Sequence, residues 1–404
     1  MNRAAVLALG ALAVLGGLGL GMFAALASSP GATGSLDPGH VANLGSAPPS
    51  AALSPSPPPS VAEPSTLPSS GPSSPPLPTP TPSPILVPAP LTGRLVTPAA
   101  AARHPIAVMI DDLSPARPQS GFSAASIVWQ APAEGGIPRY MMVFQENIPT
   151  DVGPVRSSRY YYIAWAAELR ALYAHAGGSP QALQTLREQG NGQLVYNADE
   201  FRWGNSFRRT DRDPPHNLYT TGKQLRSIAA AVGAKDGPIK WPWKFARDAV
   251  LGYRPVGGRI QLTYGNVNAI RFDYDRKSNT YRRSVTGEKR QIDAATNKRV
   301  APKNVIVMVV HFGPLNDGSK KHRLEGEVIG SGTAWISTNG VTIKGTWKKA
   351  SLTSPTRFFG PNGKAVTLTI GQTFVQVMKT TDYIHFTAGK PAPPTPLGPG
   401  FRQF

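Results

Sequence analysis

The stretch GPVRSSRYYYIAWAAELRALYAHAGGSP (residues 153–180) carries more position-specific chemistry than any other part of the chain. Gly153-Pro154 interrupts the preceding segment, and Ser157 or Ser158 can cap a helix whose apolar residues recur at helical spacing. Residues 171–176 are small and apolar, and Gly177-Gly178-Ser179-Pro180 then supplies a turn, a cap and a first-turn proline. The stretch therefore predicts the order helix, strand, glycine-rich turn, helix.

Two arginines and a histidine in this stretch indicate a ligand. Arg156 and Arg159 are three residues apart, so we expect them to share a face on the first turn of the first helix. The helix dipole disfavours cations there, which indicates an anion nearby. His175 ends the predicted strand, and open α/β sheets bind ligands beyond such strand ends. The alternative is that the arginines pair with carboxylates of the same chain and His175 is an interior hydrogen-bonded residue.

Residues 95–238 are predicted to form an α/β domain with a mixed sheet. Residues 106–110 are a short apolar run before Asp111-Asp112, as in a buried strand with carboxylates at its end. Strands at 127–130 and 140–144 are expected to form a hairpin, because Glu134-Gly135-Gly136 lies between them. A strand at 193–197 and a helix from Thr220 or Thr221 to Val232 flank a long polar loop, a length that is uncommon unless the loop is functional.

Polar side chains of this half fall at predicted strand ends or in loops, which favours one shared cleft that also includes Asp112 and Asp211. The candidates for binding a ligand are Arg117, Arg139, Arg156, Arg159, His175, Gly177, Gly178, Ser179, His216 and Asn217. The candidates for catalysis are Asp111, Glu134, His175 and His216. Asp111, His175 and His216 together could form a metal site open to water, or a histidine beside a carboxylate could act as a general base. No cofactor and no bound metal are predicted.

Residues 239–404 are predicted to form a mainly antiparallel β domain. Asn339-Gly340 is a strong signal for a tight hairpin. The expected strands cover residues 259–264, 269–274, 280–283, 305–311, 334–337, 341–344, 364–370 and 373–379.

The N-terminal residues indicate export. Residues 4–27 are 24 uncharged, mostly apolar residues, long enough to span a bilayer, and Arg3 precedes them. No Lys or Arg follows until Arg94, so the positive-inside rule places the N-terminus in the cytoplasm and the rest outside. Ala25-Leu26-Ala27 also fits a cleavage site, in which case the protein would be secreted. Residues 28–94 are rich in Pro and Ser and are expected to be a disordered stalk.

The charge of the chain is concentrated in its second half. Residues 231–404 hold 27 basic and 10 acidic residues, so they carry +17 of the total +19. In an exported protein this favours an anionic partner such as lipid head groups or a wall polymer, with another envelope protein as an alternative. Nucleic acid is not expected. The chain has no Cys, which excludes disulfides and a lipid-modified cysteine.

Several motifs in fixed order resemble the YerB-like family of bacterial envelope lipoproteins, whose function is unknown. The motifs are AVMIDD, ARPQSG, EGGIPR, GPVRSSR, HAGGSP and PHNLYT in the first half, then FDYD, Tyr281-Arg282-Arg283, NVIVMVV and GKAVTLTIGQTFVQV, over about residues 100–385. The resemblance implies an exported, surface-tethered protein of two parts with a common site at these residues. Two departures are the missing lipobox cysteine and Asp112, where related sequences often have Asn, so no role is assigned to Asp112.

The sequence favours a binding module over an enzyme. It has no G-x-S-x-G, H-E-x-x-H or phosphate-loop motif. We therefore expect a non-catalytic envelope binding or regulatory module whose Arg- and His-lined cleft holds an anion. The alternatives are a metal-dependent or acid-base hydrolase of an envelope substrate, and a regulator that docks on another envelope protein.

Overall fold

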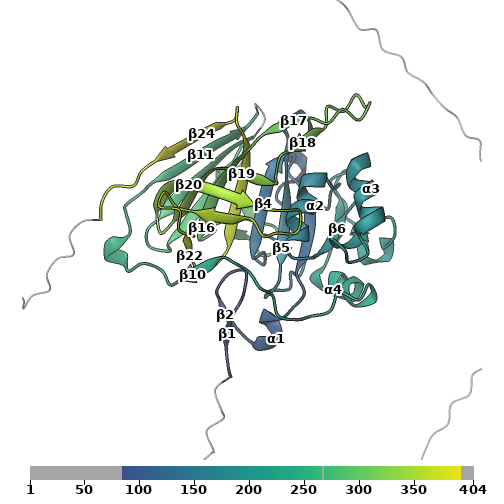
Figure 1. Ribbon diagram of the computed structural model, residues 1–404, viewed down its shortest axis with the longest axis horizontal. Coiled ribbons are helices and arrows are strands. Elements are labelled where there is room, and N and C mark those ends of the chain that lie inside the picture. Colours follow the sequence, from purple (N-terminus) through teal and green to yellow (C-terminus); the bar gives the residue numbers. More distant parts are fainter. Residues whose placement is uncertain (1–83, 266–267, 393–404) are drawn as a thin grey trace, which may run out of the picture. The chain divides into compact units, whose positions relative to one another are not determined.

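The computed structural model describes residues 84–265 and 268–392 (Figure 1). The predicted membrane segment at 4–27 and most of the predicted stalk lie outside these residues. Within the described ranges, none of the helices has the length and apolar character needed to cross a membrane. The described residues belong to one compact unit, which contains both hydrophobic clusters, as expected of a domain that folds by itself.

A ten-stranded mixed sheet runs through the whole folded part. In spatial order its strands are β21 (Arg357–Phe359), β20 (Val341–Lys349), β19 (Gly330–Thr338), β16 (Asn304–Val310), β23 (Thr373–Lys379), β4 (Ile127–Pro132), β5 (Pro138–Phe144), β3 (Ile106–Asp111), β6 (Leu172–His175) and β7 (Tyr196–Asp199). The pairs β16–β23, β23–β4, β3–β6 and β6–β7 are parallel and the others antiparallel. The mixed sheet and the hairpin of β4 and β5 confirm the prediction for the first half.

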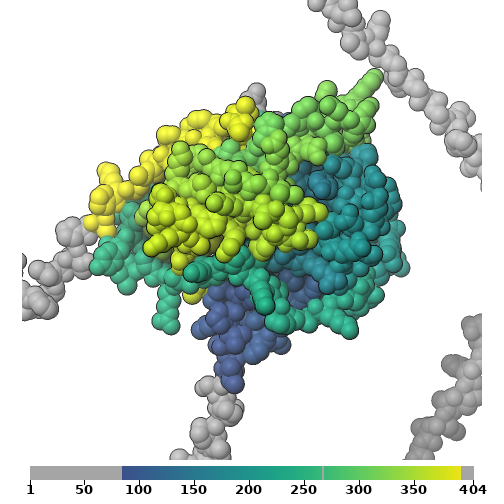
Figure 2. Space-filling view, viewed as in Figure 1, coloured from purple at the N-terminus to yellow at the C-terminus, as the bar shows by residue number. Residues whose placement is uncertain are grey.

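The predicted boundary at 238/239 does not separate two sheets. Strand β23 of the second half pairs with β4 of the first, from Thr373 opposite Ile127 to Gln376 opposite Gln130. Every residue of β4 is buried, because both faces of the sheet are covered there. Figure 2 shows the green and yellow C-terminal residues packed directly against the blue and teal N-terminal ones. The two parts are therefore halves of one body.

A second, four-stranded sheet covers one face of the large sheet. Its strands, in the order β13 (Thr280–Val285), β12 (Asn268–Asp275), β11 (Arg259–Tyr264) and β24 (Tyr383–Thr387), are all antiparallel. Buried and exposed residues alternate along β12, so Ile270 and Phe272 point into the core while Arg271 faces outward. This sheet confirms the antiparallel β prediction for part of the second half.

Four helices are described: α1 (Pro98–Ala101), α2 (Tyr160–Ala167), α3 (Pro180–Gln189) and α4 (Gly222–Ala231). The hydroxyl of Ser179 accepts from Ala182 N and caps α3, and Thr221 caps α4 in the same way. The predicted order of helix, strand, turn and helix over 153–180 is confirmed. The large sheet lies between α2 and α3 on one face and α4 with the small sheet on the other.

The start of α2 differs from the prediction. The helix begins at Tyr160 with Arg159 as an N-cap that makes no side-chain capping bond, so Ser157 and Ser158 cap nothing. Ser158 is held in extended backbone instead, since its N–H donates to Gly177 O and its carbonyl accepts from Ser179 N. Arg156 and Arg159 therefore precede the helix and do not share a face of its first turn.

The folded part also begins earlier than expected. Residues 84–94, predicted to belong to the stalk, include β1 (Val87–Pro88), which pairs with β2 (Leu95–Val96). Leu91 is fully buried in the core, and Thr92 Oγ1 donates to the carboxylate of Glu146 at 2.8 Å. Apolar burial and this bond hold the segment against the domain.

Short elements complete the fold. Asn339-Gly340 forms the two-residue turn between β19 and β20 with φ of 50° and 78°, which confirms the predicted tight hairpin. The remaining paired strands are β8 (Phe207–Arg209) with β9 (Leu218–Thr220), β10 (Lys244–Ala246) with β22 (Thr367–Thr369), β14 (Ile292–Asp293) with β15 (Lys298–Arg299), and β17 (Phe312–Pro314) with β18 (Leu324–Gly326). The 3-10 turns are η1 (Ser114–Ala116), η2 (Glu134–Gly136), η3 (Gly204–Ser206) and η4 (Leu251–Tyr253).

Candidate functional site

Several of the predicted site residues lie at the end of the large sheet where β3, β6 and β7 end. Residues 154–158 enter this edge between β3 and β6. Arg156 N donates to Met109 O at 2.9 Å on one side, and Arg156 O accepts from Ala176 N at 3.1 Å on the other. Open α/β sheets usually bind ligands in this crevice. Here the chain itself fills the crevice.

The first cluster at this edge is centred on the buried carboxylate of Asp111. Its Oδ2 accepts from Arg156 Nε at 2.7 Å and from His216 Nδ1 at 2.6 Å, and its Oδ1 accepts from Leu113 N at 3.1 Å. The structure therefore brings together Asp111, Arg156 and His216 as predicted. Because Asp111 already neutralises the guanidinium, the pair is an internal salt bridge and not an open anion site.

The second cluster has three arginines around one carboxylate. Glu134 Oε1 accepts from Arg159 Nη2, and Arg139 and Arg323 each lie 3.7 Å from a Glu134 oxygen. Arg323 also pairs with Asp317. Burial alone would raise the pKa of Glu134, but the charges of Arg159 and Arg139 more than offset it and hold that pKa below its ordinary value. Burial and the neighbouring Arg159 lower the pKa of Arg139 to about 10.

His175 and the glycine-rich turn have structural roles. His175 is fully buried, with Nδ1 donating to Gly177 O at 2.9 Å and Nε2 lying 2.8 Å from Asn197 Oδ1. Gly177 has a φ of 66°, which a residue with a side chain rarely adopts. The structure therefore supports the interpretation of His175 as an interior hydrogen-bonded residue.

The structure does not bring together Asp111, His175 and His216, the residues considered as a possible metal site. His216 binds Asp111, whereas His175 binds the turn after β6, and no group of three or more His, Asp or Glu in the described residues is arranged to hold a metal ion. Asp211 is exposed on the long loop. Asn217 is buried, and its backbone carbonyl accepts from Thr210 N at 2.8 Å. The single cleft expected from the sequence is thus two separate ion-pair clusters and an interior histidine.

A buried polar network joins the two sheets. Asp112 accepts from Arg117 Nη2 at 3.0 Å, from Gln130 Nε2 at 2.5 Å and from Asn268 Nδ2 at 2.8 Å. Burial raises the pKa of Asp112, and the nearby Arg117 and Arg283 oppose this. Asp112 and Arg117, the latter a ligand candidate from the sequence, therefore hold each other in the interior.

Arg283, which the sequence singles out only as part of the Tyr281-Arg282-Arg283 motif, is the largest fully buried charged side chain of the described residues. It is fully buried and donates to Tyr140 Oη at 2.9 Å and to Gln130 Oε1 at 2.7 Å. Its guanidinium also lies 5.4 Å from the ring centre of Phe272. The burial of Arg283 could have been predicted from the alternation along β13. Residues 281 and 283 are two apart and therefore point to the same side of the sheet, and Tyr281 is buried.

The contacts of Asp111 and His216 limit the reactions that these two residues could catalyse. An Asp–His pair can act as a general base when the histidine faces a reacting group. No hydroxyl group of the described residues hydrogen-bonds to His216, so the pair lacks the nucleophile of a hydrolytic triad. The geometry is that of an ion-pair network that fixes residues 154–159 on the sheet.

Replacing Arg156 by glutamine tests this assignment. We expect a loss of about 1–3 kcal/mol in the free energy of unfolding, because Asp111 loses a charge-assisted bond but keeps His216 and Leu113 N. Urea unfolding of the two proteins measures the difference. The opposite result would be a variant of unchanged stability, with sulfate raising the melting temperature of the wild type only. That result would show that Arg156 binds an anion.

The comparisons with known proteins agree with the motifs. The chain matches the family described as "Protein of unknown function (DUF3048)", its N-terminal domain over residues 91–235 and its C-terminal domain over residues 260–375. It is 31% identical over 312 residues to "Putative lipoprotein YerB" of Bacillus subtilis (strain 168), covering 75% of this chain and 89% of that protein. The crystal structure of YerB from Bacillus subtilis has a TM-score of 0.65 and 27% identity, and the match covers 74% of this chain and 99% of that one. The chain therefore belongs to the YerB-like family.

Proposed function

We propose that the chain is a non-catalytic module of the cell envelope that binds a phosphate-bearing partner through arginines of the small sheet. The name of the Bacillus subtilis relative describes a lipoprotein, which supports an envelope location. In this chain residues 4–27 would replace the lipid anchor. Each arginine of the motifs at the end of the large sheet is paired with a carboxylate, whereas on the small sheet arginines outnumber the carboxylates near them. This contrast is the observation that carries the proposal.

Four arginines on the outer side of the small sheet and the adjoining β14–β15 hairpin form what we call the arginine face: Arg271, Arg282, Arg290 and Arg299. Burial lowers the pKa of Arg299, and the positive charges of Arg282 and Arg290 lower it further. Arg271 also lowers this pKa, and Asp273 is the one carboxylate among these neighbours that raises it. An anion bound there would relieve the repulsion among these arginines.

The carboxylates near the arginine face do not neutralise it. Asp273 accepts from both Arg271 and Arg259 at 2.8 Å, so one negative charge serves two arginines. Asp275 lies 3.9 Å from Arg282. Arg290 and Arg299 form no ion pair with any of the residues the structure describes. Phosphate oxygens of lipid head groups or of a wall polymer have the charge and geometry that guanidinium groups bind.

A double replacement of Arg271 and Arg282 by glutamine tests the proposal with residues 79–404. We expect binding to vesicles of phosphatidylglycerol, or to inorganic polyphosphate, to weaken about 10–30-fold at 50 mM salt, since each surface cation contributes about 1 kcal/mol. The difference should vanish near 500 mM salt because exposed charges are screened. Vesicle sedimentation and calorimetry measure the two affinities.

The matched control is Lys320→Gln with Lys321→Gln, which removes two exposed cations from the loop between β17 and β18, away from the small sheet (Figure 1). This variant should bind like the wild type. Binding to vesicles alone would identify a lipid partner, and binding to polyphosphate alone a polymer. Equal loss in both variants, or no binding to either probe, would overturn the proposal.

A hydrolase is the second candidate, and one observation favours it. His216 Nδ1 donates to Asp111, which fixes the ring in the orientation that a general base needs. The test is hydrolysis of isolated envelope material by the wild type and by His216→Gln. Turnover that disappears in the variant, while its melting temperature stays the same, would replace the binding module by an enzyme.

A further inference from the structure

We infer that a pocket between the two sheets binds a single-chain anionic amphiphile, with its hydrocarbon chain among aromatic rings and its negative head group on Lys344. The inference does not depend on the arginine face, which lies on the other side of the small sheet.

Aromatic rings from both sheets form part of the walls of this pocket. Its volume is about 400 Å³, within the range of small-molecule sites. Tyr274, Tyr281 and Phe386 line it from the small sheet, and Trp335 lines it from β19. The rings of Trp335 and Phe386 have centres 5.5 Å apart at an interplanar angle of 34°. These faces offer an apolar surface for hydrocarbon.

The charged groups of the pocket are all positive. Arg259 and Lys344 line it, and no carboxylate or carboxamide side chain does. Arg259 Nε already donates to Asp273 Oδ1 at 2.8 Å, so Lys344 is the cation of the lining that a ligand could use. Lys344 is exposed, lies 5.9 Å from the ring centre of Trp335, and forms no ion pair among the described residues. A sugar would meet few acceptors for its hydroxyl groups here, whereas an anionic head group would meet the ammonium group of Lys344. The lining therefore favours an apolar ligand with one negative end.

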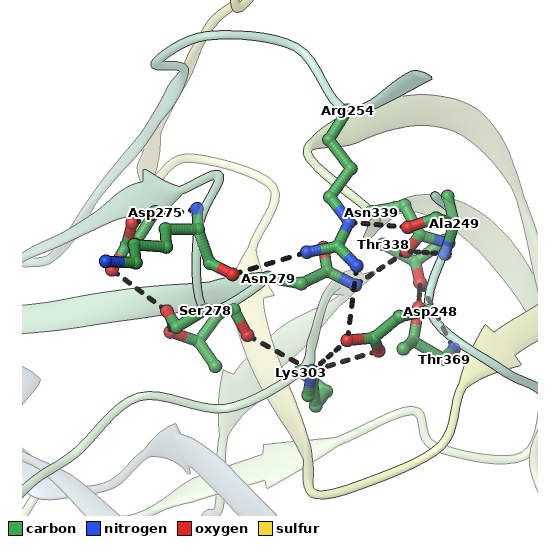
Figure 3. Close-up of polar contacts among 12 residues, drawn as sticks. Asp248, Ala249, Arg254, Asp275, Ser278, Asn279, Lys303, Thr338, Asn339 and Thr369 are labelled. Carbon is green, nitrogen blue, oxygen red and sulfur yellow. Dashed lines mark hydrogen bonds and ion pairs between the residues drawn. The ribbon is translucent and has the colours of Figure 1, made fainter. Parts of the chain in front are cut away.

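A polar network behind the pocket keeps it open (Figure 3). Asn339 Oδ1 accepts from Ala249 N at 3.1 Å and from Asn279 Nδ2 at 2.7 Å, which ties three turns together. Tyr274 Oη donates to Asn279 at 2.7 Å, and Tyr281 Oη accepts from Gly340 N at 2.9 Å. Both tyrosines of the wall are thus fixed at their outer ends.

An ion pair and a hydrogen bond also fix residues 248–254, which lie next to this network. Lys303 Nζ lies 2.7 Å from Asp248 Oδ2, and Arg254 Nε donates to Ala249 O at 2.6 Å (Figure 3). These bonds hold residues 248–254 beside the β19–β20 turn. The pocket is therefore preformed, which lowers the entropy cost of binding a ligand.

Apolar side chains are exposed at the border of the pocket. Pro255 and Val341 line it, and Val341 is 52% exposed. Tyr253 and Val256, on either side of Pro255 in the sequence, are 84% and 45% exposed. Clustered exposed apolar groups mark surfaces that meet an apolar partner. This border would receive the part of a hydrocarbon chain that extends beyond the pocket.

The test uses dodecanoate with residues 79–404, below the micelle concentration of the probe. We expect saturable binding by calorimetry and a change in tryptophan fluorescence that is lost in Trp335→Phe. Lys344→Gln should weaken dodecanoate about fivefold, the equivalent of one surface cation at about 1 kcal/mol. Lys348→Gln, an exposed lysine of the same strand that does not line the pocket, should leave the affinity unchanged.

Two further probes separate the parts of the inference. Butyrate has the charge without the chain and should not bind saturably, and dodecanol has the chain without the charge and should bind more weakly than dodecanoate. Equal affinity for dodecanol and dodecanoate, an equal effect of Lys344→Gln and Lys348→Gln, or no saturable binding of dodecanoate would each overturn the inference. Lys344→Gln should still bind polyphosphate like the wild type, so failure here and failure of the arginine face remain distinct results.

Discussion

Replacing Glu168 by glutamine is expected to lower the free energy of unfolding by about 3–5 kcal/mol, because it leaves a buried lysine without its counter-ion. Glu168 and Lys349 are both fully buried and lie 2.8 Å apart, and Thr356 Oγ1 also donates to the carboxylate. Burial already lowers the pKa of Lys349, and Glu168 opposes that change. Since Glu168 follows α2 and Lys349 ends β20, the pair joins the two family segments. Urea unfolding of residues 79–404 measures the loss.

Two variants separate the stranded charge from a general loss of packing. The double replacement Glu168→Met with Lys349→Met removes both charges and should recover most of the stability, as in other buried pairs replaced by apolar side chains. Glu188→Gln on the exposed side of α3 should change stability by less than about 0.5 kcal/mol. A Glu168→Gln variant within 1 kcal/mol of the wild type would show that Lys349 is not charged in the folded protein.

Replacing Glu134 by glutamine is expected to cost about 3 kcal/mol, near the lower end for a broken buried pair because the Glu134 side chain is 19% exposed. The change leaves Arg139, Arg159 and Arg323 facing one another with only Asp317 as a carboxylate partner. Their mutual repulsion should make the variant sensitive to added anions. We expect 50 mM sulfate to raise the melting temperature of the variant more than that of the wild type.

The pH dependence of stability checks the same cluster. The arginines hold the pKa of Glu134 below its ordinary value of 4.5. A carboxylate with a depressed pKa contributes stability above its unfolded pKa and loses that contribution as the pH falls through the folded value. The wild type should therefore lose stability relative to Glu134→Gln as the pH falls below about 4.5. A constant difference between the two proteins from pH 7 to pH 3 would contradict the ion-pair assignment.

The ion-pair clusters give the arginines of the family motifs a structural role. Arg117, Arg156 and Arg159 each have a carboxylate partner supplied by another motif of the same half. Charged motif residues at the ends of strands can therefore form ion pairs within the fold as readily as they can form a ligand site. The arginines that we propose for a partner lie on the small sheet and the β14–β15 hairpin, where the sequence alone showed an excess of positive charge.

Local patterns alone were enough to predict most elements. The apolar run at 106–110, the turn and cap residues Gly177-Gly178-Ser179-Pro180, and the pair Asn339-Gly340 each specify their structure through neighbouring residues. The family also follows from the sequence, because ordered motifs are properties of the chain and not of its fold. The prediction of export and the charge excess of the second half also rest on the sequence alone.

Only the tertiary structure decided how the halves join and which charges remain available. The pairing of β23 with β4, the entry of residues 154–158 between β3 and β6, and the burial of Arg283 between the sheets all link residues that are far apart in the sequence. Whether an arginine is neutralised depends on a carboxylate a few ångströms away in space, and the Coulomb energy follows that distance and the local burial, not the separation along the chain. Residues at strand ends could be recognised from the sequence, but their partners could not.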